Sequence, residues 1–592
     1  LVRNAAEAGF TILRNWGGGV FQYDAYYDAL DEFGILCYQD LMCTSRRPLQ
    51  RARCSCGARI HTSHSVVVVL PPRAPTRSRP HAHTPSLPFS PAADAQGGHS
   101  PTYGDSTQAA EIAHQVRRLS HHPSMVLYTS CNECIFHGNM TLFVNFAMEV
   151  VAAEDTTTAI WPACPASGWK SGVNRLTGFP SGLPLAIGGD TLDLHGPYIK
   201  GCTDAFEPAD GCFGEHASDP FKVSAQMLVN QSIWPPWGRS GPIGVGLKGT
   251  AFSEYGFTVM SSFESMSATI SEENWGIQQP VFAQRNYPCD NYIRAFFGNR
   301  SNVSAVGAAA LQRQTWQCMI AQALAAKQYT EALRSMNTVL VQLWQFNEIW
   351  PTGGWGSIEY GSPVKGQVVG GRWKPLQHFL RRSVYATVGA ACLEDGRCYV
   401  RNDGKMAFRG ILRLTLIKLA TGRPAWSSDV SLAIARGAHT VQWVCAKQGG
   451  PGPVNASGVS CAAWKTILAD AHCTRETCVF NADVHATAAS STPLSSNQQL
   501  LLPPGDLAVR TDAVVTTVVG TPNADGLIPV TVNATATAVL VTLTTLAPGV
   551  FSDNAFLLTP HRAAKLLFTP YGAPDAAALR ASLRTVHLAL YI

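Results

Sequence analysis

Residues 1–43 read LVRNAAEAGFTILRNWGGGVFQYDAYYDALDEFGILCYQDLMC, and this stretch decides the fold class. An amphipathic helix closes on Ala5 and Ala8, and FTILRNW follows as a strand that ends at three glycines. Residues 26–33 have a helical pattern, and GILCYQD is a second strand. Because helix and strand alternate along the chain, we predict βα units and a parallel sheet.

The same alternation resumes near residue 105. Helical spacing on one face is shared by Ala109, Ile112, Val116 and Leu119, and the apolar stretch MVLYTS that follows predicts a buried strand. Farther on, the pattern predicts strands at 182–190, 249–256 and 338–351, and helices at 305–335 and 373–383. These segments continue the α/β region to residue 384.

Residues 44–104 interrupt this pattern. They are basic and unpatterned at first and then rich in Pro, Ser, Ala and Arg, a composition that cannot bury enough apolar surface to fold. Three interpretations are open: a disordered insertion, translated non-coding sequence, or a functional basic arm. We favour the second over the first, and the third least.

From residue 385 the pattern becomes all-β. Segments such as LRLTLIKLA, VSLAIA, TVQWV and AVVTTVV follow one another without helices, at the spacing of about 8–12 residues that is typical of β-sandwiches. A Leu/Pro-rich joint at 496–505 divides this part in two. We therefore predict a catalytic α/β domain at 1–384, with 44–104 as an insertion, and β-sandwich domains at 385–495 and 496–592.

The composition indicates a globular protein of several domains. The chain has 592 residues, of which 46% are apolar and 14% are charged. The net charge of +5 is small for this length and no basic stripe interleaves with aromatic residues, so we expect no nucleic-acid partner. No apolar run reaches the roughly 20 residues that a membrane-spanning helix needs.

The 17 cysteines form no strong zinc pattern, because Cys131 and Cys134 flank a glutamate with no histidine at metal-binding spacing. Six N-x-S/T sequons, taken with the cysteine content, favour a secretory route. Cys473 and Cys478 have a spacing that suits a local disulfide. No signal peptide is visible, and the opening helix indicates a start inside a larger protein.

Two glutamates stand at the ends of predicted strands, where an α/β barrel carries its catalytic groups. Glu133 follows MVLYTSCN, and Glu254 lies within GTAFSEYG. Cleavage of a glycosidic bond needs two carboxyl groups, one to protonate the leaving oxygen and one to attack or to activate water. Either glutamate alone is more often an ordinary exposed or salt-bridged residue, so the neighbouring motifs decide between the two interpretations.

Seven segments in sequence order carry a resemblance to the β-mannosidases of glycoside hydrolase family 2. They are LRNWGGGVF (13–21), DEFGILCYQDLM (31–42), LSHHPSMVLYTSCNE (119–133), FSEYGFTVMSSFES (252–265), LWQFNEIWPTGGWGSIEYG (343–361), HCTRETCVF (472–480) and FSDNAFLLTP (551–560). The first five resemble motifs of the family's catalytic domain, and the last two look like the tail of animal-type lysosomal β-mannosidases. The resemblance covers nearly the whole chain except 44–104.

The resemblance implies a (β/α)8 barrel without its first strand, followed by two immunoglobulin-like β-sandwich domains. It implies a retaining exo-β-mannosidase that removes terminal non-reducing β-D-mannose from oligosaccharides and N-glycan fragments. By the match of motifs, Glu133 is the acid/base, Glu254 is the nucleophile, and Asn132 hydrogen-bonds the 2-hydroxyl of the sugar. Neither a metal nor an organic cofactor is required, and the implied location is the lysosome or the secretory pathway.

Five more residues fall in the matching motifs. Trp16, Trp344 and Trp355 would line the terminal sugar subsite, although core packing explains each of them nearly as well. Asp40 ends a predicted strand, where it either binds a sugar hydroxyl or holds Arg14. A purely structural, buried ion pair between Asp40 and Arg14 is the alternative that stays open.

The chain departs from the family pattern near the acid/base. Cys131 and Cys134 replace polar residues, Tyr128 replaces a tryptophan, and residues 362–372 lengthen a short segment. Two alternatives are therefore open. One is a catalytically impaired carbohydrate-binding scaffold, and the other is a different family 2 glycosidase, such as an endo-β-mannosidase or an exo-β-glucosaminidase.

Overall fold

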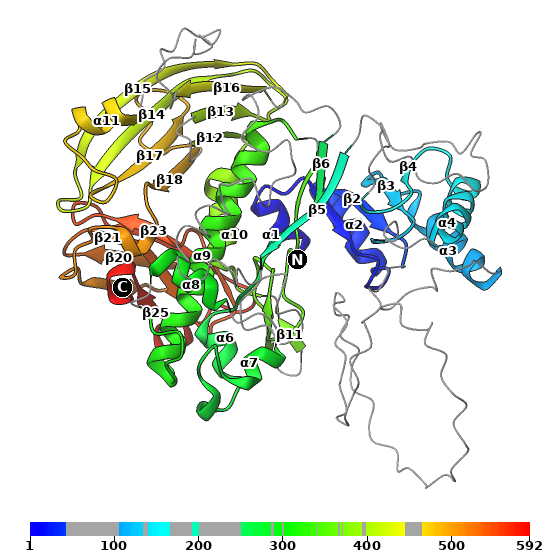
Figure 1. The fold of residues 1–592 in the computed structure, drawn as a ribbon, viewed down its shortest axis with the longest axis horizontal. Coiled ribbons are helices and arrows are strands. Elements are labelled where there is room, and N and C mark those ends of the chain that lie inside the picture. Colours follow the sequence, from blue (N-terminus) through cyan, green and yellow to red (C-terminus); the bar gives the residue numbers. More distant parts are fainter. Residues whose placement is uncertain are drawn as a thin grey trace, which may run out of the picture. The chain divides into compact units, whose positions relative to one another are not determined.

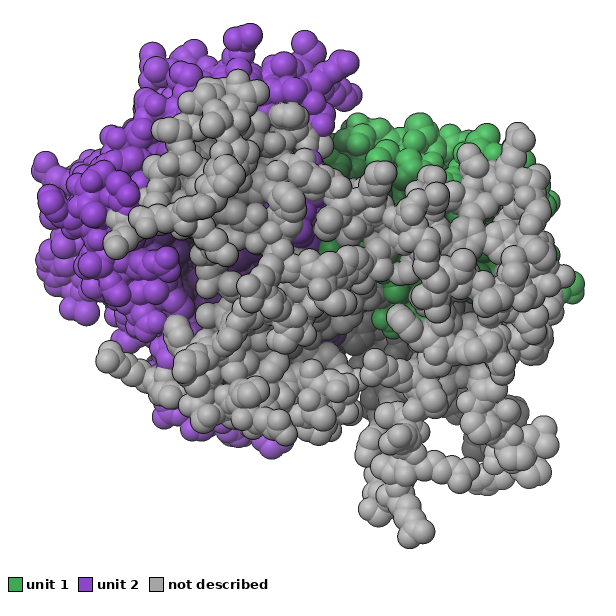
Figure 2. All heavy atoms as spheres, turned by 45° about the horizontal axis from the view of Figure 1, so that its top comes forward, with its two compact units in different colours: residues 1–6, 10–195, 248–253 green, residues 7–9, 196–247, 254–592 purple. Residues whose placement is uncertain are grey.

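The computed structural model (Figure 1) describes residues 1–42, 106–133, 140–165, 192–199, 250–285, 289–298, 301–338, 340–364, 367–369, 371–392, 398–437, 439–444 and 464–592. The chain divides into two compact units, coloured in Figure 2. Unit 1 comprises residues 1–6, 10–195 and 248–253, and unit 2 comprises residues 7–9, 196–247 and 254–592. The predicted insertion at 44–104 and the predicted strand at 182–190 lie outside the described residues.

Unit 1 is built on a parallel four-stranded sheet in the order β1-β2-β3-β4. Its strands are β1 (Ile12–Asn15), β2 (Leu36–Asp40), β3 (Met125–Thr129) and β4 (Ala159–Trp161). Its helices are α1 (Val2–Glu7), α2 (Asp24–Phe33), α3 (Ser106–Leu119) and α4 (Met140–Glu154). Because a helix lies between each strand and the next, the predicted βα units and parallel sheet are confirmed.

Helices α2 and α3 supply much of the core of unit 1. Their buried faces carry Tyr27, Leu30, Ile112, Val116 and Leu119, each at most 1% exposed. Helix α2 ends at Gly34, whose φ of 67° lies in the left-handed region that glycine adopts without steric cost. The chain can therefore turn directly from α2 into β2.

Asp31 in the last turn of α2 joins this helix to the turn before β3. Its carboxylate accepts a hydrogen bond from the Ser124 backbone N–H at 2.9 Å and lies 2.6 Å from Nδ1 of His122. Burial opposes ionisation of Asp31, but the hydrogen bonds from Ser124 and His122 outweigh it and lower the pKa of this carboxyl. Two of the quoted motifs, 31–42 and 119–133, are thus in direct contact.

The α/β part of unit 2 surrounds a long, buried helix, α9 (Ala308–Ser335). A three-stranded sheet has the order β5-β6-β8, with β5 (Leu192–Ile199), β6 (Thr250–Phe257) and β8 (Leu340–Leu343). Residues 192–195 and 250–253 of this sheet are assigned to unit 1, and the remainder to unit 2. Strands β7 (Val259–Met260) and β9 (Gly353–Gly354) pair, as do β10 (Ser362–Val364) and β11 (Gln367–Val369). Shorter helices are α6 (Phe263–Ser267), η2 (Glu272–Asn274), α7 (Pro280–Gln284), α8 (Asp290–Phe297), α10 (Pro375–Phe379) and η3 (Leu380–Val384).

These observations bear on the predicted (β/α)8 barrel. Among the described residues, the α/β strands form separate sheets of four and three strands, together with the two short pairs. The βα units are consistent with such a barrel, and the barrel itself stays a prediction.

The first β-sandwich packs a three-stranded sheet against a four-stranded one. The orders are β12-β13-β16 and β15-β14-β17-β18. The strands are β12 (Val388–Cys392), β13 (Cys398–Asn402), β14 (Phe408–Lys418), β15 (Pro424–Ile434), β16 (His439–Val444), β17 (Cys478–His485) and β18 (Ser495–Leu500), with helix α11 (Trp464–Asp470) before β17. Strand β18 pairs with β17 across the predicted boundary at 495/496, so this sandwich extends to Leu500.

Three disulfides link segments of unit 2 among the described residues. Cys392–Cys398 joins β12 to β13, and Cys289–Cys318 joins the start of α8 to α9. The disulfide expected between Cys473 and Cys478 is also present, immediately before β17. The prediction for this last pair is therefore confirmed.

The second β-sandwich follows η4 (Pro504–Asp506). Its sheets have the orders β19-β20-β24-β22 and β23-β21-β25. The strands are β19 (Val515–Val519), β20 (Ile528–Ala534), β21 (Ala538–Thr544), β22 (Gly549–Phe551), β23 (Phe556–Leu558), β24 (Ala564–Pro570) and β25 (Arg584–Val586), with α12 (Ala576–Ser582) and η5 (Leu588–Leu590). Apolar residues alternate inward along β20, as Ile528, Val530 and Val532 show with at most 1% exposure.

Helix α9 contacts both sandwiches. Tyr399 of β13 donates a hydrogen bond from its hydroxyl to the backbone carbonyl of Glu331 at 2.7 Å. At the other end of the helix, Nε1 of Trp316 donates to Oγ1 of Thr542 on β21 at 2.9 Å. One buried helix therefore carries specific polar contacts to both β domains.

None of the described helices combines the length and the apolar character that crossing a membrane requires. The lysosomal or secretory location stays a prediction.

Candidate active site

The predicted site residues divide between the two units. Unit 1 holds Arg14, Trp16, Asp40, Asn132 and Glu133, and unit 2 holds Glu254, Trp344 and Trp355. Each half of the candidate site is described by itself.

In unit 1, Arg14 and Asp40 form a buried ion pair at the ends of neighbouring strands. Nε of Arg14 donates to one carboxylate oxygen of Asp40 at 3.1 Å, and Nη2 donates to the other. The backbone N–H of Gly17 adds a third hydrogen bond to Asp40, at 3.0 Å. The Arg14 side chain is 6% exposed and that of Asp40 is 0% exposed. Of the two roles proposed for Asp40, the structure shows that it holds Arg14.

The same guanidinium group orients Asn132. Nη2 of Arg14 donates to Oδ1 of Asn132 at 2.7 Å, and Asn132 is 3% exposed. Because the amide oxygen is committed to Arg14, the amide nitrogen is directed away from the guanidinium. The buried pair predicted as a structural alternative therefore also fixes the residue next to Glu133.

Glu133 follows β3 in a backbone conformation that glutamate rarely adopts. Its φ is 56°, in the left-handed region, and its backbone N–H donates to the carbonyl of Cys164 at 2.6 Å. Asn132 forms a parallel bridge with the same Cys164, which follows β4. Such left-handed residues cost free energy and cluster at functional sites, where surrounding contacts hold them in place.

Trp16 is half-buried and rests on its own glycine-rich turn. A Cβ atom at Gly18 would lie 2.1 Å from Cη2 of Trp16, so only glycine leaves room for the indole ring there. The Gly19 backbone N–H donates to the carbonyl of Trp16 at 3.0 Å. The three glycines of LRNWGGGVF thus allow Trp16 to fold back over the end of β1.

The two faces of the unit 1 sheet differ in chemistry. Asn15 and Gln39 are hydrogen-bonded to each other at 2.8 Å, and both bond the hydroxyl of Tyr27 on α2. Side chains alternate along a strand, so Arg14 and Asp40 point to the opposite face. The candidate site residues of unit 1 therefore lie on the face that α2 does not cover.

Glu254 lies in the middle of β6 and is 5% exposed. Its neighbour Tyr255 donates or accepts a hydrogen bond with Oγ1 of Thr330 on α9 at 2.7 Å. The ring of Tyr255 also lies 5.0 Å from that of Tyr329, another residue of α9. Because alternate side chains of a strand point to opposite faces, Glu254 points away from α9.

Trp344 and Trp355 meet at Gly256, two residues after Glu254. A Cβ atom at Gly256 would lie 2.2 Å from the backbone oxygen of Trp344 and 2.3 Å from Cδ1 of Trp355. The backbone N–H of Trp344 donates to the carbonyl of Tyr255 at 2.7 Å. Both predicted tryptophans therefore pack next to the strand that carries Glu254. Trp355 is 7% exposed, so core packing explains most of its surface.

Sequence reasoning missed a second buried ion pair in unit 2. Nζ of Lys374 lies 2.7 Å from Oε1 of Glu348, and both side chains are 0% exposed. The Gly356 backbone N–H donates to the same oxygen at 2.9 Å. Burial raises the pKa of Glu348, and Lys374 opposes that rise. Both residues lie within or close to a quoted motif, but nothing in the sequence showed that they pair.

Comparisons with known proteins were consistent with these motifs. The family model Ig_mannosidase, an Ig-fold domain, matches residues 511–589. The β-mannosidase of Bos taurus is 22% identical over 634 aligned residues, covering 100% of this chain and 57% of that protein. The chain is therefore similar to curated β-mannosidases, and its C-terminal region matches an Ig-fold domain model.

Solved structures show the same fold. A β-D-mannosidase from Dictyoglomus thermophilum matches with a TM-score of 0.60 at 17% identity, covering 99% of this chain and 57% of that chain. The exo-chitosanase CsxA of Amycolatopsis orientalis matches with a TM-score of 0.59 at 13% identity, covering 99% and 60%. The chain thus spans a little over half the length of these β-mannosidases and of the exo-chitosanase.

The departures from the β-mannosidase pattern have structural counterparts. Cys131 is disulfide-bonded and 0% exposed, so this replacement tethers the backbone directly before Asn132. Tyr128, in the place of a tryptophan, is 0% exposed, and burial raises the pKa of its hydroxyl. Cys134 lies outside the described residues. Neither described replacement removes the contact between Arg14 and Asn132.

Proposed function

We propose that the chain carries the catalytic residues of a retaining exo-β-mannosidase that acts on terminal non-reducing β-D-mannose of oligosaccharides, including N-glycan fragments. The observation that carries this proposal is the fixed orientation of Asn132 by Arg14 and Asp40, immediately before Glu133. A rigid amide beside an acid at a strand end suits a sugar hydroxyl next to the bond that breaks. The likeness to β-mannosidases supports the choice of mannose.

The proposed mechanism is a double displacement with two glutamates. Glu254 attacks the anomeric carbon while Glu133 gives its proton to the leaving oxygen, and a covalent glycosyl-enzyme forms. Glu133 then removes a proton from water, which attacks the same carbon and releases mannose with its configuration retained. This mechanism requires the two carboxyl groups to lie about 5–5.5 Å apart, a separation that stays a prediction.

Asn132 would strengthen the transition state. Its amide nitrogen points away from Arg14, so it can donate a hydrogen bond to the 2-hydroxyl of the sugar. Such a contact tightens as positive charge develops on the sugar ring. The contact needs little reorganisation, because the ion pair holds Asn132 before the substrate arrives.

The test compares hydrolysis of the 4-nitrophenyl β-glycosides of mannose, glucose, galactose and glucosamine. We expect preference for the mannoside, release of β-mannose as the first product seen by NMR, and loss of turnover in Glu254→Ala. Glu273→Gln is the matched control, because this exposed glutamate of the same unit should not affect turnover. Preference for the glucosaminide, release of α-mannose, or no turnover by folded protein would contradict the proposal.

A further inference from the structure

The segment that follows Glu254 is buried and short. Strand β6 ends at Phe257, β7 follows at once, and α6 begins at Phe263. Thr258, Val259 and Met260 are 0% exposed, so this link between the strand and α6 is enclosed by packed neighbours. A displacement of α6 would therefore be transmitted to the strand that carries Glu254.

The second β-sandwich is hydrogen-bonded to Glu264 of α6. Nε of Arg584 donates to Oε1 of Glu264 at 2.8 Å, and Nη2 donates to Oε2 at 3.2 Å. Thr544 adds a hydrogen bond from its hydroxyl to Oε1 at 3.0 Å. The carboxylate side chain is 8% exposed and the guanidinium side chain is 20% exposed. A bidentate ion pair of this kind fixes the orientation of the carboxylate as well as its distance from the guanidinium group.

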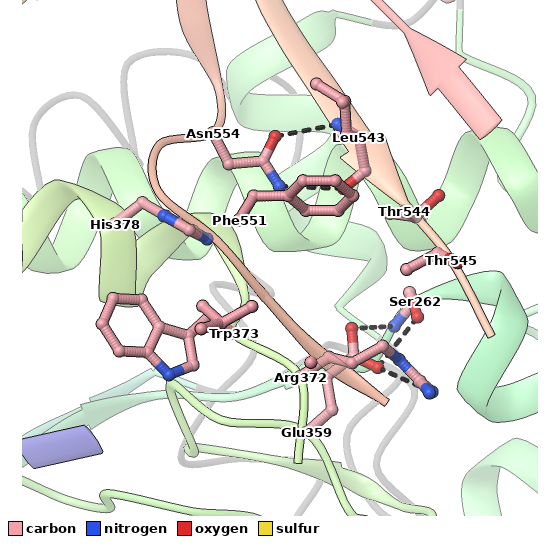
Figure 3. Close-up of a pocket in the computed structure, with 12 residues that line it drawn as sticks. Ser262, Glu359, Arg372, Trp373, His378, Leu543, Thr544, Thr545, Phe551 and Asn554 are labelled. Atoms are coloured by element: carbon pink, nitrogen blue, oxygen red, sulfur yellow. Dashed lines mark hydrogen bonds and ion pairs between the residues drawn. The ribbon is translucent and has the colours of Figure 1, made fainter. Parts of the chain in front are cut away.

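A second network holds the residues on either side of Glu264 (Figure 3). Glu359 accepts hydrogen bonds from the backbone N–H of Ser262 at 3.3 Å and from its hydroxyl at 2.9 Å, and also from Ser265. Arg372 lies 3.5 Å from Glu359 and donates to the hydroxyl of Ser265. The segment at 262–265 is thus held by polar contacts from the α/β region and from the second sandwich.

The junction between this segment and the second sandwich is lined partly by polar side chains. A small pocket at this junction is lined by Ser262, Glu359 and Arg372 on one side and by residues 543–545 of the sandwich on the other. Polar side chains therefore form part of the lining on both sides. The directional hydrogen bonds are what define the position of the segment here.

We propose that Arg584 is a positioning residue, which acts through Glu264 to hold the strand of Glu254 in its reactive position. The second sandwich is then part of the catalytic apparatus and not only a stabilising domain. This inference rests on the proposed glycosidase function. A displacement of about 1 Å at a reacting group can cost about a hundredfold in rate, so the loss of this pair should be visible in kcat.

The test uses Arg584→Met, which keeps the length of the side chain but removes both hydrogen bonds. The matched control is Arg382→Met. Arg382 joins the same sandwich to η3 through Asp553 at 2.9 Å, and its other described hydrogen bonds go to the backbone carbonyls of residues 554 and 555. Competent sites are first counted by trapping with 2-deoxy-2-fluoro-β-mannosyl fluoride, in which the Glu254 carboxylate bonds to the anomeric carbon and fluoride leaves. Turnover of the nitrophenyl mannoside is then expressed per trapped site.

We expect both variants to lower the unfolding temperature, but only Arg584→Met to lower kcat per trapped site, by about tenfold or more. Arg584→Lys, which keeps the charge and one donor, should recover part of that loss. Equal kcat per site in Arg584→Met and wild type would overturn the inference while leaving the proposed function intact. A wild-type protein that neither reacts with the trap nor turns over mannoside would overturn the proposed function, and this inference with it.

Discussion

The pair formed by Glu348 and Lys374 allows a quantitative prediction about the stability of unit 2. Both side chains are fully buried at a separation of 2.7 Å. Lys374→Met would keep the volume of the side chain and leave Glu348 with the Gly356 N–H as its one remaining described hydrogen bond. A Cβ atom at Gly354 would lie 2.0 Å from Oε2 of Glu348, which shows how closely the backbone surrounds this carboxylate.

Removing one partner of a buried ion pair typically costs about 3–5 kcal/mol, because the other charge stays buried without compensation. For Lys374→Met we expect a loss of this size at pH 7, which would shift the urea midpoint of unfolding by roughly 1 M. Glu348→Gln together with Lys374→Met should lose less than Lys374→Met alone, since the neutral amide carries no charge to desolvate.

The loss should also depend on pH. Burial already raises the pKa of Glu348 above its usual 4.5, and removal of Lys374 takes away the opposing effect. A carboxyl whose folded-state pKa is raised contributes most stability below its unfolded pKa, and that contribution falls as pH rises towards the folded pKa. The fall is about 1.4 kcal/mol per pH unit. The gap between Lys374→Met and wild type should therefore be smaller at pH 5 than at pH 7.

The assay is urea unfolding followed by tryptophan fluorescence at both pH values. Arg510→Met is the control, because Arg510 pairs with Asp512 at an exposed position and its loss should leave the midpoint nearly unchanged. An equal loss at pH 5 and pH 7, or a double variant less stable than Lys374→Met, would refute the reasoning. Either result would mean that Glu348 does not carry a buried charge that Lys374 compensates.

Three further predictions concern other contacts. Asp40→Asn leaves the Arg14 guanidinium without its buried counter-ion and should cost about 3–5 kcal/mol in urea unfolding, more than Asp553→Asn at its half-exposed ion pair. Gly256→Ala should destabilise unit 2 by about 1–3 kcal/mol and change the near-ultraviolet circular dichroism, because a methyl group there meets backbone and indole at 2.2–2.3 Å; an unchanged spectrum would contradict this. Trp316→Phe should lower stability by about 1 kcal/mol through the lost hydrogen bond to Thr542, and combining it with Thr542→Val should add little further loss.

Local sequence patterns predicted the elements well where the spacing of apolar residues agreed with the positions of glycines that end strands or helices. Apolar spacing located α3, with Ile112, Val116 and Leu119 buried as expected, and the glycines after Trp16 marked the end of β1. A pairing of Arg14 with Asp40 was one of the two roles that the matching motifs left open for Asp40, and the structure shows this pairing between neighbouring strands. In each case the deciding contacts lie within one βα unit.

Contacts between residues far apart in the sequence were not predictable in the same way. Glu264 and Arg584 are separated by 320 positions, and neither residue stands out in composition or periodicity. The predicted end of the first sandwich at residue 495 also differs from the observed one. Residues 496–500 fall in the predicted Leu/Pro-rich joint, but they belong to β18 and pair with β17. Pairing in a sheet depends on the partner strand, which a pattern along one strand does not specify.

In both units, the alternation of side chains along a strand places the candidate site residues on the face of the sheet opposite a packed helix. In unit 1, Asn15 and Gln39 bond Tyr27 of α2, and strand alternation turns Arg14 and Asp40 to the other face. In unit 2, Tyr255 bonds Thr330 of α9, and the same alternation turns Glu254 away from that helix. In each unit the polar groups thus lie on the face of the sheet that the named helix leaves uncovered.

The two units differ in the contacts that hold their candidate site residues in position. Asn132 is oriented by an ion pair between adjacent strands, so unit 1 needs only its own βα units to position the residue next to Glu133, the proposed acid/base. Glu254 stands on a strand whose continuation is held by Glu359, and through Glu264 by Arg584 of the last strand of the second sandwich. If Glu254 is the nucleophile, as we propose, its strand should become competent only when that sandwich has folded and docked. Mutations in the sandwich that weaken docking should consequently reduce kcat before they reduce the content of folded protein.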